Sequence, residues 1–190
     1  MAPNAKNVLV GIPDKASGGV YFSDAPIEAG TYPTDLATLP ASLEPSGFLS
    51  EDGVTETNEN DTERIKAWGG DTVRIVNTDH TVTYSMTFLE SSPRILRAVY
   101  GDENVTETDG IVTVLVNSLP LEHRSWALEM KDGARRIRVL IPNGQITARG
   151  DITYTHTGAI QYEVTIEAFA DDDGNKAIKT LDAEAAPVTP

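Results

Sequence analysis

The side chains that could carry chemistry in this sequence are few and scattered. His80, His123 and His156 are far apart, and none has a metal-binding spacing such as H-E-x-x-H. Residues 171–175 (Asp-Asp-Asp-Gly-Asn) could hold calcium loosely, but the other positions of an EF-hand loop and its terminal glutamate are missing. We interpret the histidines as surface residues and the acidic run as a solvated turn, and we expect no metal and no cofactor.

Catalytic motifs are missing as well. The sequence has no G-x-S-x-G elbow, no phosphate-binding G-x-x-x-x-G-K-[ST] loop and no dinucleotide-binding fingerprint. Cysteine is absent, which excludes disulfides, thiolate metal sites and cysteine nucleophiles. Carboxylates are numerous, but without a pocket of known shape they give no specific acid–base signal. The sequence therefore predicts a protein that is not an enzyme.

Two charged clusters remain to be explained. Residues 44–63 contain seven acidic residues and no basic one: Glu44, Glu51, Asp52, Glu56, Glu59, Asp61 and Glu63. Basic residues gather on predicted neighbouring strands and on a predicted helix: Lys131, Arg135, Arg136, Arg138, Arg149, Arg94 and Arg97. Each cluster could be a solvated face. Because surfaces of opposite charge guide association, we instead predict contacts between copies of the chain, made by Glu51, Asp52, Glu56 and Glu59 with Arg135, Arg136 and Arg138.

Length and composition indicate one globular domain. The chain has 190 residues, of which 39% are hydrophobic and 23% charged. It has no apolar run long enough to cross a bilayer, and its first residues lack the apolar core of a signal peptide, so we expect it to stay in the cytoplasm where it is made. The net charge of −14 either serves solubility or gives a surface that repels phosphate and does not grip nucleic acid.

Strand signals dominate the middle of the chain, with one helix among them. Residues 80–90 alternate between apolar side chains and threonine or serine, which is typical of a half-buried strand. Residues 71–77 are predicted to be its hairpin partner, joined through the polar pair 78–79. A serine cap followed by proline then begins a helix over residues 93–100.

Further strands are predicted over residues 7–12, 19–23, 111–117, 124–130, 135–141, 145–155 and 159–169. Turn signals are found at residues 131–133 (Lys-Asp-Gly), 142–144 (Pro-Asn-Gly) and 156–158 (His-Thr-Gly). The sequence thus predicts a mainly β fold, a β-sandwich or open barrel with one short α-helix and extended arms.

The predicted domain covers residues 1–173. Within it, residues 24–46 hold four prolines and little periodicity, so we expect an extended arm that lies against a neighbour, and residues 47–63 form a second arm. Residues 174–190 are predicted to be a loosely held C-terminal tail.

A long stretch of the first half resembles a known family. GFLSEDGVTETNENDTERIKAWGGDTVRIV, continuing into HTVTYSMTFLESSPRILRAVYGDENV, closely resembles the major tail proteins of long-tailed actinobacterial phages. The resemblance covers roughly residues 5–170 and is most specific at Gly47 through Thr57, at the Ile65-x-x-Trp68 turn with Gly70-Asp71, in the aromatic strand and at the helix that ends in Tyr100-Gly101.

The resemblance implies a structural protein of the virion tail. Proteins of this family form hexameric rings that stack into a tube, with a mostly β fold that is shared with contractile phage tubes and type VI secretion tubes. The acidic arm resembles the loop with which family members reach a neighbouring subunit or ring. Tape-measure and tail terminator proteins are the implied partners, with no membrane, and double-stranded DNA passes through without being specifically bound. We expect no additional immunoglobulin-like domain, because the chain stops soon after Asp173.

A tube that conducts DNA should not adhere to it, because each phosphate neutralised by a cation adds affinity. The polar face of the predicted strand 159–169 is therefore a candidate lining of the channel, through Glu163, Thr165 and Glu167. Two alternatives stay open. One is a non-catalytic β-sandwich that binds a receptor or a carbohydrate, although the sequence holds only two tryptophans for aromatic platforms. The other is the tube protein of a secretion system.

Overall fold

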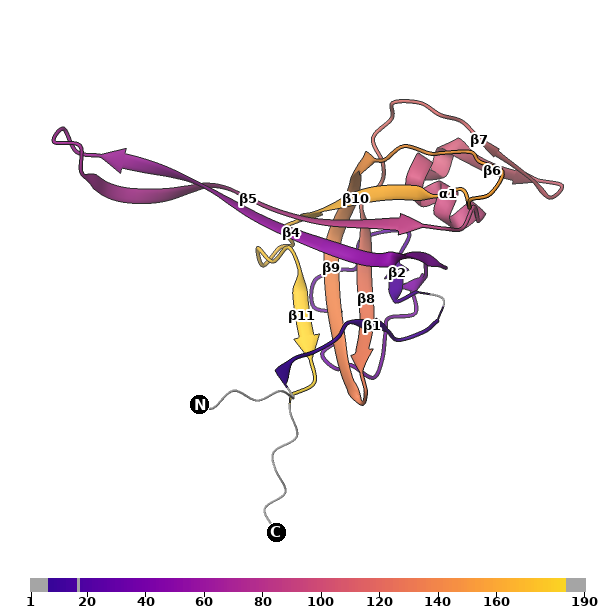
Figure 1. Cartoon of the computed structure of the whole chain (residues 1–190), viewed down its shortest axis with the longest axis horizontal. Coiled ribbons are helices and arrows are strands. Elements are labelled where there is room, and N and C mark those ends of the chain that lie inside the picture. The colour runs from indigo at the N-terminus through magenta and orange to yellow at the C-terminus, as the bar shows by residue number, and fades with distance from the viewer. Residues whose placement is uncertain (1–6, 17, 184–190) are drawn as a thin grey trace, which may run out of the picture.

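The computed structural model describes residues 7–16 and 18–183, and its largest element is one curved sheet (Figure 1). Its nine strands include a path in the order β3-β2-β8-β9-β10-β5-β4, with β1 paired to β8 and β11 paired to β9. The bounds are β1 Ile12–Pro13, β2 Val20–Phe22, β3 Glu44–Pro45, β4 Leu49–Lys66, β5 Thr72–Phe88, β8 Arg124–Asp132, β9 Arg135–Arg149, β10 Tyr162–Phe169 and β11 Ile178–Leu181. The predicted mainly β fold is confirmed, as an open sheet and not a closed barrel.

The predicted helix is confirmed at the predicted bounds, as α1 (Pro93–Tyr100). The Ser92 side chain accepts a hydrogen bond from the Ile95 amide, and Gly101 ends the helix at a φ of 99°. A short 3₁₀ turn, η2 (Asp102–Asn104), follows. A separate two-stranded sheet of β6 (Val105–Thr108) and β7 (Ile111–Val114) then packs beside α1. Among the described residues, no helix is long and apolar enough to span a membrane.

The main core lies between α1 and one face of the curved sheet. It takes every second residue of β5 and β10, as the alternation predicts: Val82, Tyr84, Met86, Phe88, Tyr162, Val164 and Ile166. Trp126 of β8 is 1% exposed, and its ring centroid lies 4.9 Å from that of Phe22. Aromatic pairs at such separations stabilise a core beyond the area they bury.

The proline-rich segment 24–46 packs on its own subunit. Its Leu43 is buried in a second core with Tyr21, Ala127 and Leu140, and Ile27, Tyr32 and Leu39 pack against this cluster. The apolar side chains of the segment pack against apolar side chains on the second face of the sheet. The expectation that the segment lies against a neighbour stays a prediction, because packing on its own sheet leaves most of the segment exposed.

Two strands are longer than predicted. Thr72–Phe88 is one strand, β5, and the polar pair Thr78-Asp79 is not a turn. Both halves of β5 pair with β4, and Thr78 is the extra residue of a bulge, because Asp61 faces Asp79 while Thr62 faces Asn77. The hairpin turn lies instead between β4 and β5, where the Gly70 amide donates to the Ala67 carbonyl.

The second long strand is β9, which runs through the Pro142-Asn143-Gly144 sequence that was predicted to be a turn. Gly144 is needed there for packing, since a Cβ at this position would lie 2.8 Å from the Trp126 ring and 3.0 Å from Ile166. The predicted Lys-Asp-Gly turn is confirmed, because Asp132 faces Arg135 across the β8–β9 connection.

Other boundaries differ from the prediction at the ends of the chain. Strand β11 (Ile178–Leu181) pairs with β9, so this part of the predicted loose tail belongs to the sheet. Residues 184–190, the rest of that tail, lie outside the described residues. Strand β1 is only two residues long, and β1 and β2 pair with β8 rather than with each other. Residues 150–161, predicted as strand and turn, form the irregular connection between β9 and β10.

Candidate functional site

The residues with catalytic potential are not brought together by the fold. His80 Nε2 lies 3.0 Å from Asn58 Oδ1, and His123 Nδ1 lies 2.7 Å from Asn143 Oδ1. Each of these two histidines therefore hydrogen-bonds to a nearby asparagine. The acidic run at 171–175 is a turn in which Asp171 Oδ1 accepts the Asn175 amide at 2.7 Å. Within residues 7–16 and 18–183, no group of histidine and carboxylate side chains could hold a metal ion.

A long hairpin of β4 and β5 is the most prominent feature of the surface (Figure 1). Its outer part, residues 61–79, has only Val76 partly buried, so it projects from the body as an arm. The end of this arm is apolar: Ile65, Trp68, Val73 and Ile75 are all exposed, and Trp68 completely so. Isolated β-hairpins are marginally stable in water, which indicates that the arm is built for a partner.

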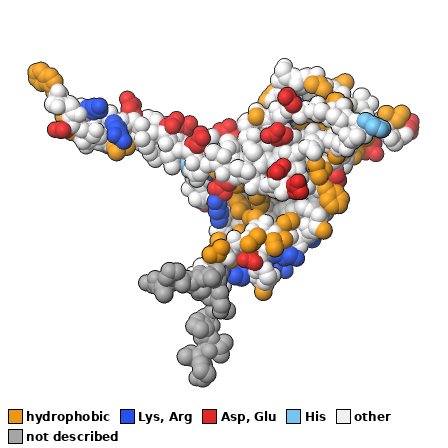
Figure 2. Space-filling view, in the orientation of Figure 1, with side chains coloured by type: hydrophobic (Ala, Val, Ile, Leu, Met, Phe, Trp, Pro, Cys, Tyr) orange, Lys and Arg blue, Asp and Glu red, His pale blue; other side chains and the backbone are white. Residues whose placement is uncertain are grey.

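The charge of the arm changes along its length (Figure 2). Its shaft carries Asp61, Glu63 and Asp79, next to Glu59 of the hairpin base, whereas residues 64–75 carry three basic side chains and one acidic one: Arg64, Lys66, Arg74 and Asp71. The sequence prediction identified the acidic shaft but missed the basic and apolar end. The signal was present as four large apolar residues on either side of Gly69-Gly70 in an otherwise polar segment.

The predicted acidic contact residues fall into three environments. Glu51 and Asp52 lie at the base of β4, where the Ser50 hydroxyl is 2.9 Å from Asp52 Oδ2. Glu56 forms an ion pair with Lys179 of β11, at 2.7 Å, and so holds the arm base to the body. Glu59 faces Thr81 on the opposite side of the hairpin and is exposed.

The predicted basic contact residues bind their own chain. Arg135 donates to the Asp182 carbonyl at 2.9 Å, and the exposed Arg136 donates to the Leu36 carbonyl at 2.8 Å. Arg138 is 2% exposed and pairs with Glu129, with a second contact of 3.2 Å between Nη2 and Oε2. Arg138 therefore belongs to the interior of the subunit, which the prediction of a contact between subunits did not anticipate.

The buried Arg138–Glu129 pair leads to a stability prediction. Arg138→Ala should lower the free energy of unfolding by about 3–5 kcal/mol, because it leaves the Glu129 charge without its partner in a low-dielectric site. It also removes donors to the Asp35 and Thr38 carbonyls, which lie at 2.7 and 2.9 Å. Urea unfolding followed by tryptophan fluorescence measures the change. The matched control, Arg136→Ala, should stay within about 0.5 kcal/mol of the wild type, and equal losses in the two variants would contradict this prediction.

One face of the sheet is polar across four strands. The register places two rows across β4, β5, β10 and β9: first Thr57, Thr83, Glu167 and Gln145, then Thr55, Ser85, Thr165 and Ala148. Glu163 faces Thr87 beyond them and is exposed. The Ser85 and Thr165 hydroxyls are 3.2 Å apart. The predicted grouping of Glu163, Thr165 and Glu167 on one face is confirmed, and these rows contain no lysine or arginine.

Both sides of this polar face end in strands that can accept a further partner. In the part of the chain that the structure describes, β4 is the last strand of the sheet. On the other side, β9 pairs with β8 only up to Gly144, so its residues 145–149 pair with β10 alone. Unpaired edges of this kind expose backbone N–H and C=O groups and readily pair with another chain.

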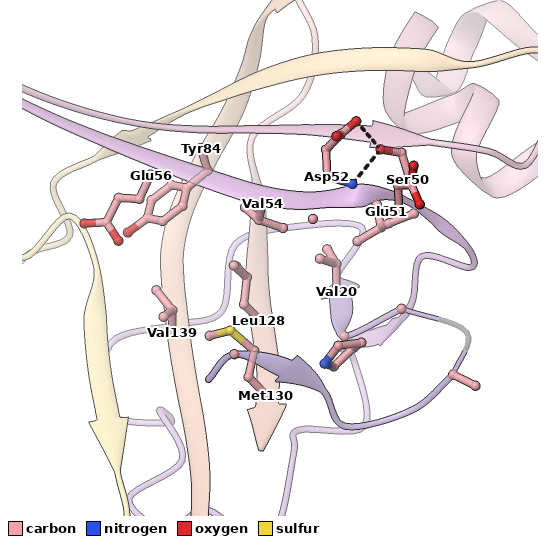
Figure 3. A pocket seen from close by; sticks show the side chains of 17 residues that line it. Val20, Ser50, Glu51, Asp52, Val54, Glu56, Tyr84, Leu128, Met130 and Val139 are labelled. Carbon is pink, nitrogen blue, oxygen red and sulfur yellow. Dashed lines mark hydrogen bonds between the residues drawn. The ribbon is translucent and has the colours of Figure 1, made fainter. Parts of the chain in front are cut away.

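A cavity of about 570 Å³ lies at the base of the arm (Figure 3). Its apolar lining comes from β2, β4, β8 and β9: Val20, Leu49, Val54, Leu128, Met130 and Val139. Glu51, Asp52 and Glu56 stand at its β4 side. The Tyr84 hydroxyl is buried there and has no hydrogen-bond partner among the described residues. Burial, together with the Glu56 carboxylate, raises the pKa of Tyr84, so its phenol is neutral at physiological pH.

These surfaces define a β-rich structural subunit with an arm, open sheet edges and an apolar cavity. The whole chain, residues 1–190, matches the model of the phage tail tube protein family, and the chain belongs to that family. It is a structural protein of the phage tail, and its place is the virion. The predicted resemblance to phage tail proteins is thereby confirmed.

Two solved structures are similar in fold. One is a chain of the extended-state sheath–tube complex of an extracellular contractile injection system, PVC, with 10% identity and a TM-score of 0.44 over 94% of this chain and 99% of that one. The other is a chain of the anti-feeding prophage cap, the AFP tube terminating cap, with 11% identity and a TM-score of 0.43 over 97% of this chain and 100% of that one. No curated protein sequence matches the chain.

Proposed function

We propose that copies of this chain form hexameric rings that stack into the tail tube of a long-tailed phage, the conduit through which the genome leaves. The observation that carries the proposal is the polar four-strand face bounded by an unpaired edge on each side. If β4 of one copy pairs with residues 145–149 of the next, the faces join into one sheet. A sheet continued around a ring closes on itself and has no exposed edge left.

The polar face then lines the channel. Its rows are made of threonine, serine, glutamate, glutamine and alanine, so they offer a DNA backbone no cation to bind. We therefore propose Glu163, Thr165 and Glu167 as residues of the channel wall. The tape-measure protein before ejection, and a terminator protein at the tube end, are the partners that such a tube requires. The DNA passes through without being specifically bound.

Charged contacts help the copies to associate in register. Our proposed contact residues between subunits remain Glu51, Asp52 and Glu59 on β4, with Arg135 and Arg136 near the β8–β9 turn. Arg138 and Glu56 are placed differently, since both are held by ion pairs within the subunit. Rim charges of this kind mainly set encounter rate and register, while packing supplies affinity.

Electron microscopy of the purified chain in negative stain tests the proposal. We expect rings or tubes with an open channel, and their formation should depend on protein concentration because assembly is a mass-action process. The family assignment favours this result over that expected of a receptor-binding or carbohydrate-binding module. Monomers that stay dispersed at high concentration, and that bind a glycan instead, would contradict the proposed function.

A further inference from the structure

The cavity at the arm base is suited to a large apolar side chain that also carries one hydrogen-bonding atom. Its lining is aliphatic, and the buried Tyr84 hydroxyl lacks a hydrogen-bond partner in the described chain. Buried tyrosine hydroxyls normally have such a partner. Glu51 and Asp52 make its border acidic, while the third carboxylate, Glu56, is paired with Lys179. The fitting occupant is thus a large apolar side chain that carries a hydrogen-bond donor, on a segment with positive charge.

The end of the arm has this composition. Trp68 is completely exposed, and its indole combines a large apolar ring with one N–H donor. Arg64, Lys66 and Arg74 lie at the same end of the hairpin, so residues 64–75 have the charge opposite to that of the cavity border. A large apolar side chain with charged side chains around it is typical of the residues that anchor protein interfaces.

The arm of a subunit cannot fill the cavity of the same subunit. Val54 lines the cavity at one end of β4, and Lys66 ends the strand at the other. At a rise of about 3.3 Å per residue, the strand between them spans about 40 Å. Because the cavity and the tip are at opposite ends of one extended hairpin, an arm that fills the cavity has to come from another copy.

We propose that Trp68 of one subunit docks in the cavity beneath β4 of a second subunit, with its indole N–H directed to the Tyr84 hydroxyl and the basic tip residues beside Glu51 and Asp52. The proposal rests on the proposed function, since it names the contact by which copies associate. It joins two different surfaces, so each subunit both offers an arm and accepts one. Such head-to-tail contacts close into rings or continue along an axis, and do not stop at a dimer.

Cross-linking between two single-cysteine variants tests the contact. The chain has no cysteine of its own, so every cross-link reports an introduced thiol. Gly69→Cys places a thiol beside Trp68 without removing it, and no atom would lie within 4 Å of its new Cβ. Ser50→Cys places a nearly isosteric thiol at the cavity. We expect tubes grown from an equal mixture to give a dimer when treated with a short bis-maleimide.

A matched control uses another group of exposed apolar residues, Leu115, Val116 and Leu119 after β7. Ser118→Cys lies within it and should not link to Gly69→Cys. A strong link between positions 69 and 118, or a Ser50→Cys thiol that reacts freely with maleimide in finished tubes, overturns the proposal. Wild-type chain that forms no rings or tubes refutes the proposed function itself, and this contact with it.

Removal of the anchor gives a second, independent readout. Trp68→Ala should raise the protein concentration needed for tube growth by at least about 30-fold, as expected for a central aromatic anchor. Tyr84→Phe keeps the core packing and removes only the acceptor, so it should raise this concentration by a smaller factor. If Trp68→Ala assembles at the wild-type concentration, Trp68 is not the anchor.

Discussion

Shortening the arm should abolish tube formation while leaving the subunit folded. In this variant, Asn60 is joined to His80, its partner across the hairpin, through a two-residue Asn-Gly turn. Such a turn matches the right-handed twist of the two strands. The residues removed, 61–79, include only one that is partly buried, so the core loses almost no contact. Circular dichroism should still show a folded β-rich body and the urea midpoint should match the wild type, whereas electron microscopy should show neither tubes nor stacked rings.

The control for arm length is a change in the shaft alone. Thr62→Ala with Thr78→Ala leaves the arm at full length and its end unchanged, and both positions are exposed. This variant should assemble as the wild type does. Tubes of normal length from the shortened variant would show that the arm has no part in assembly, and loss of the folded signal would show that the arm stabilises the subunit instead.

The elements that were predicted correctly depend on local signals. The helix at 93–100 follows from a serine cap, a proline at its start and a glycine after its end, all within a few residues. The polar and apolar faces of β5 and β10 follow from strict alternation, since a strand turns every second side chain to the same face. This alternation alone is enough to place Glu163, Thr165 and Glu167 together on the polar face of β10.

The errors arose where a local signal had a second physical explanation. The Thr78-Asp79 pair has turn chemistry, but a bulge uses the same residues without reversing the chain. Gly144 follows Pro-Asn as in a turn, but its missing side chain makes room for Trp126 of the adjacent strand. Only the partner strands distinguish these cases, and the partner of β5 lies on the far side of the turn at 67–71.

The sequence also could not predict which of the charged side chains are buried. Arg136 and Arg138 differ by two positions and have the same chemistry, yet one is exposed and the other is almost completely buried against Glu129. The difference depends on residues 24–46, which fold back over the second face of the sheet and place the Asp35 and Thr38 carbonyls beside Arg138. A contact across about one hundred positions leaves no periodic trace in the sequence.

A change of sign on the polar face should slow genome ejection. Glu163→Lys with Glu167→Lys places cations on the proposed channel wall, repeated in every subunit of the tube. Neither residue has an ion pair in the described structure, so rings should still form. DNA moving along this wall would exchange phosphate contacts at every ring, and ejection from virions built with the variant should be slowed several-fold at low salt.

The salt dependence of the defect and the position of the introduced lysines together show whether the channel wall causes slow ejection. The affinity of cation–phosphate contacts falls with salt, with a log–log slope of about −0.9 per phosphate neutralised, so the defect should diminish as salt rises. Glu28→Lys with Glu107→Lys makes the same change in charge at two exposed positions outside the polar rows and should eject normally. Glu163→Gln with Glu167→Gln should also eject nearly normally, because it removes repulsion without adding a cation. Normal ejection at low salt by the Glu163→Lys and Glu167→Lys variant would place these glutamates on the outer surface of the tube. An equal defect in the Glu28 and Glu107 control would assign the effect to net charge and not to the channel.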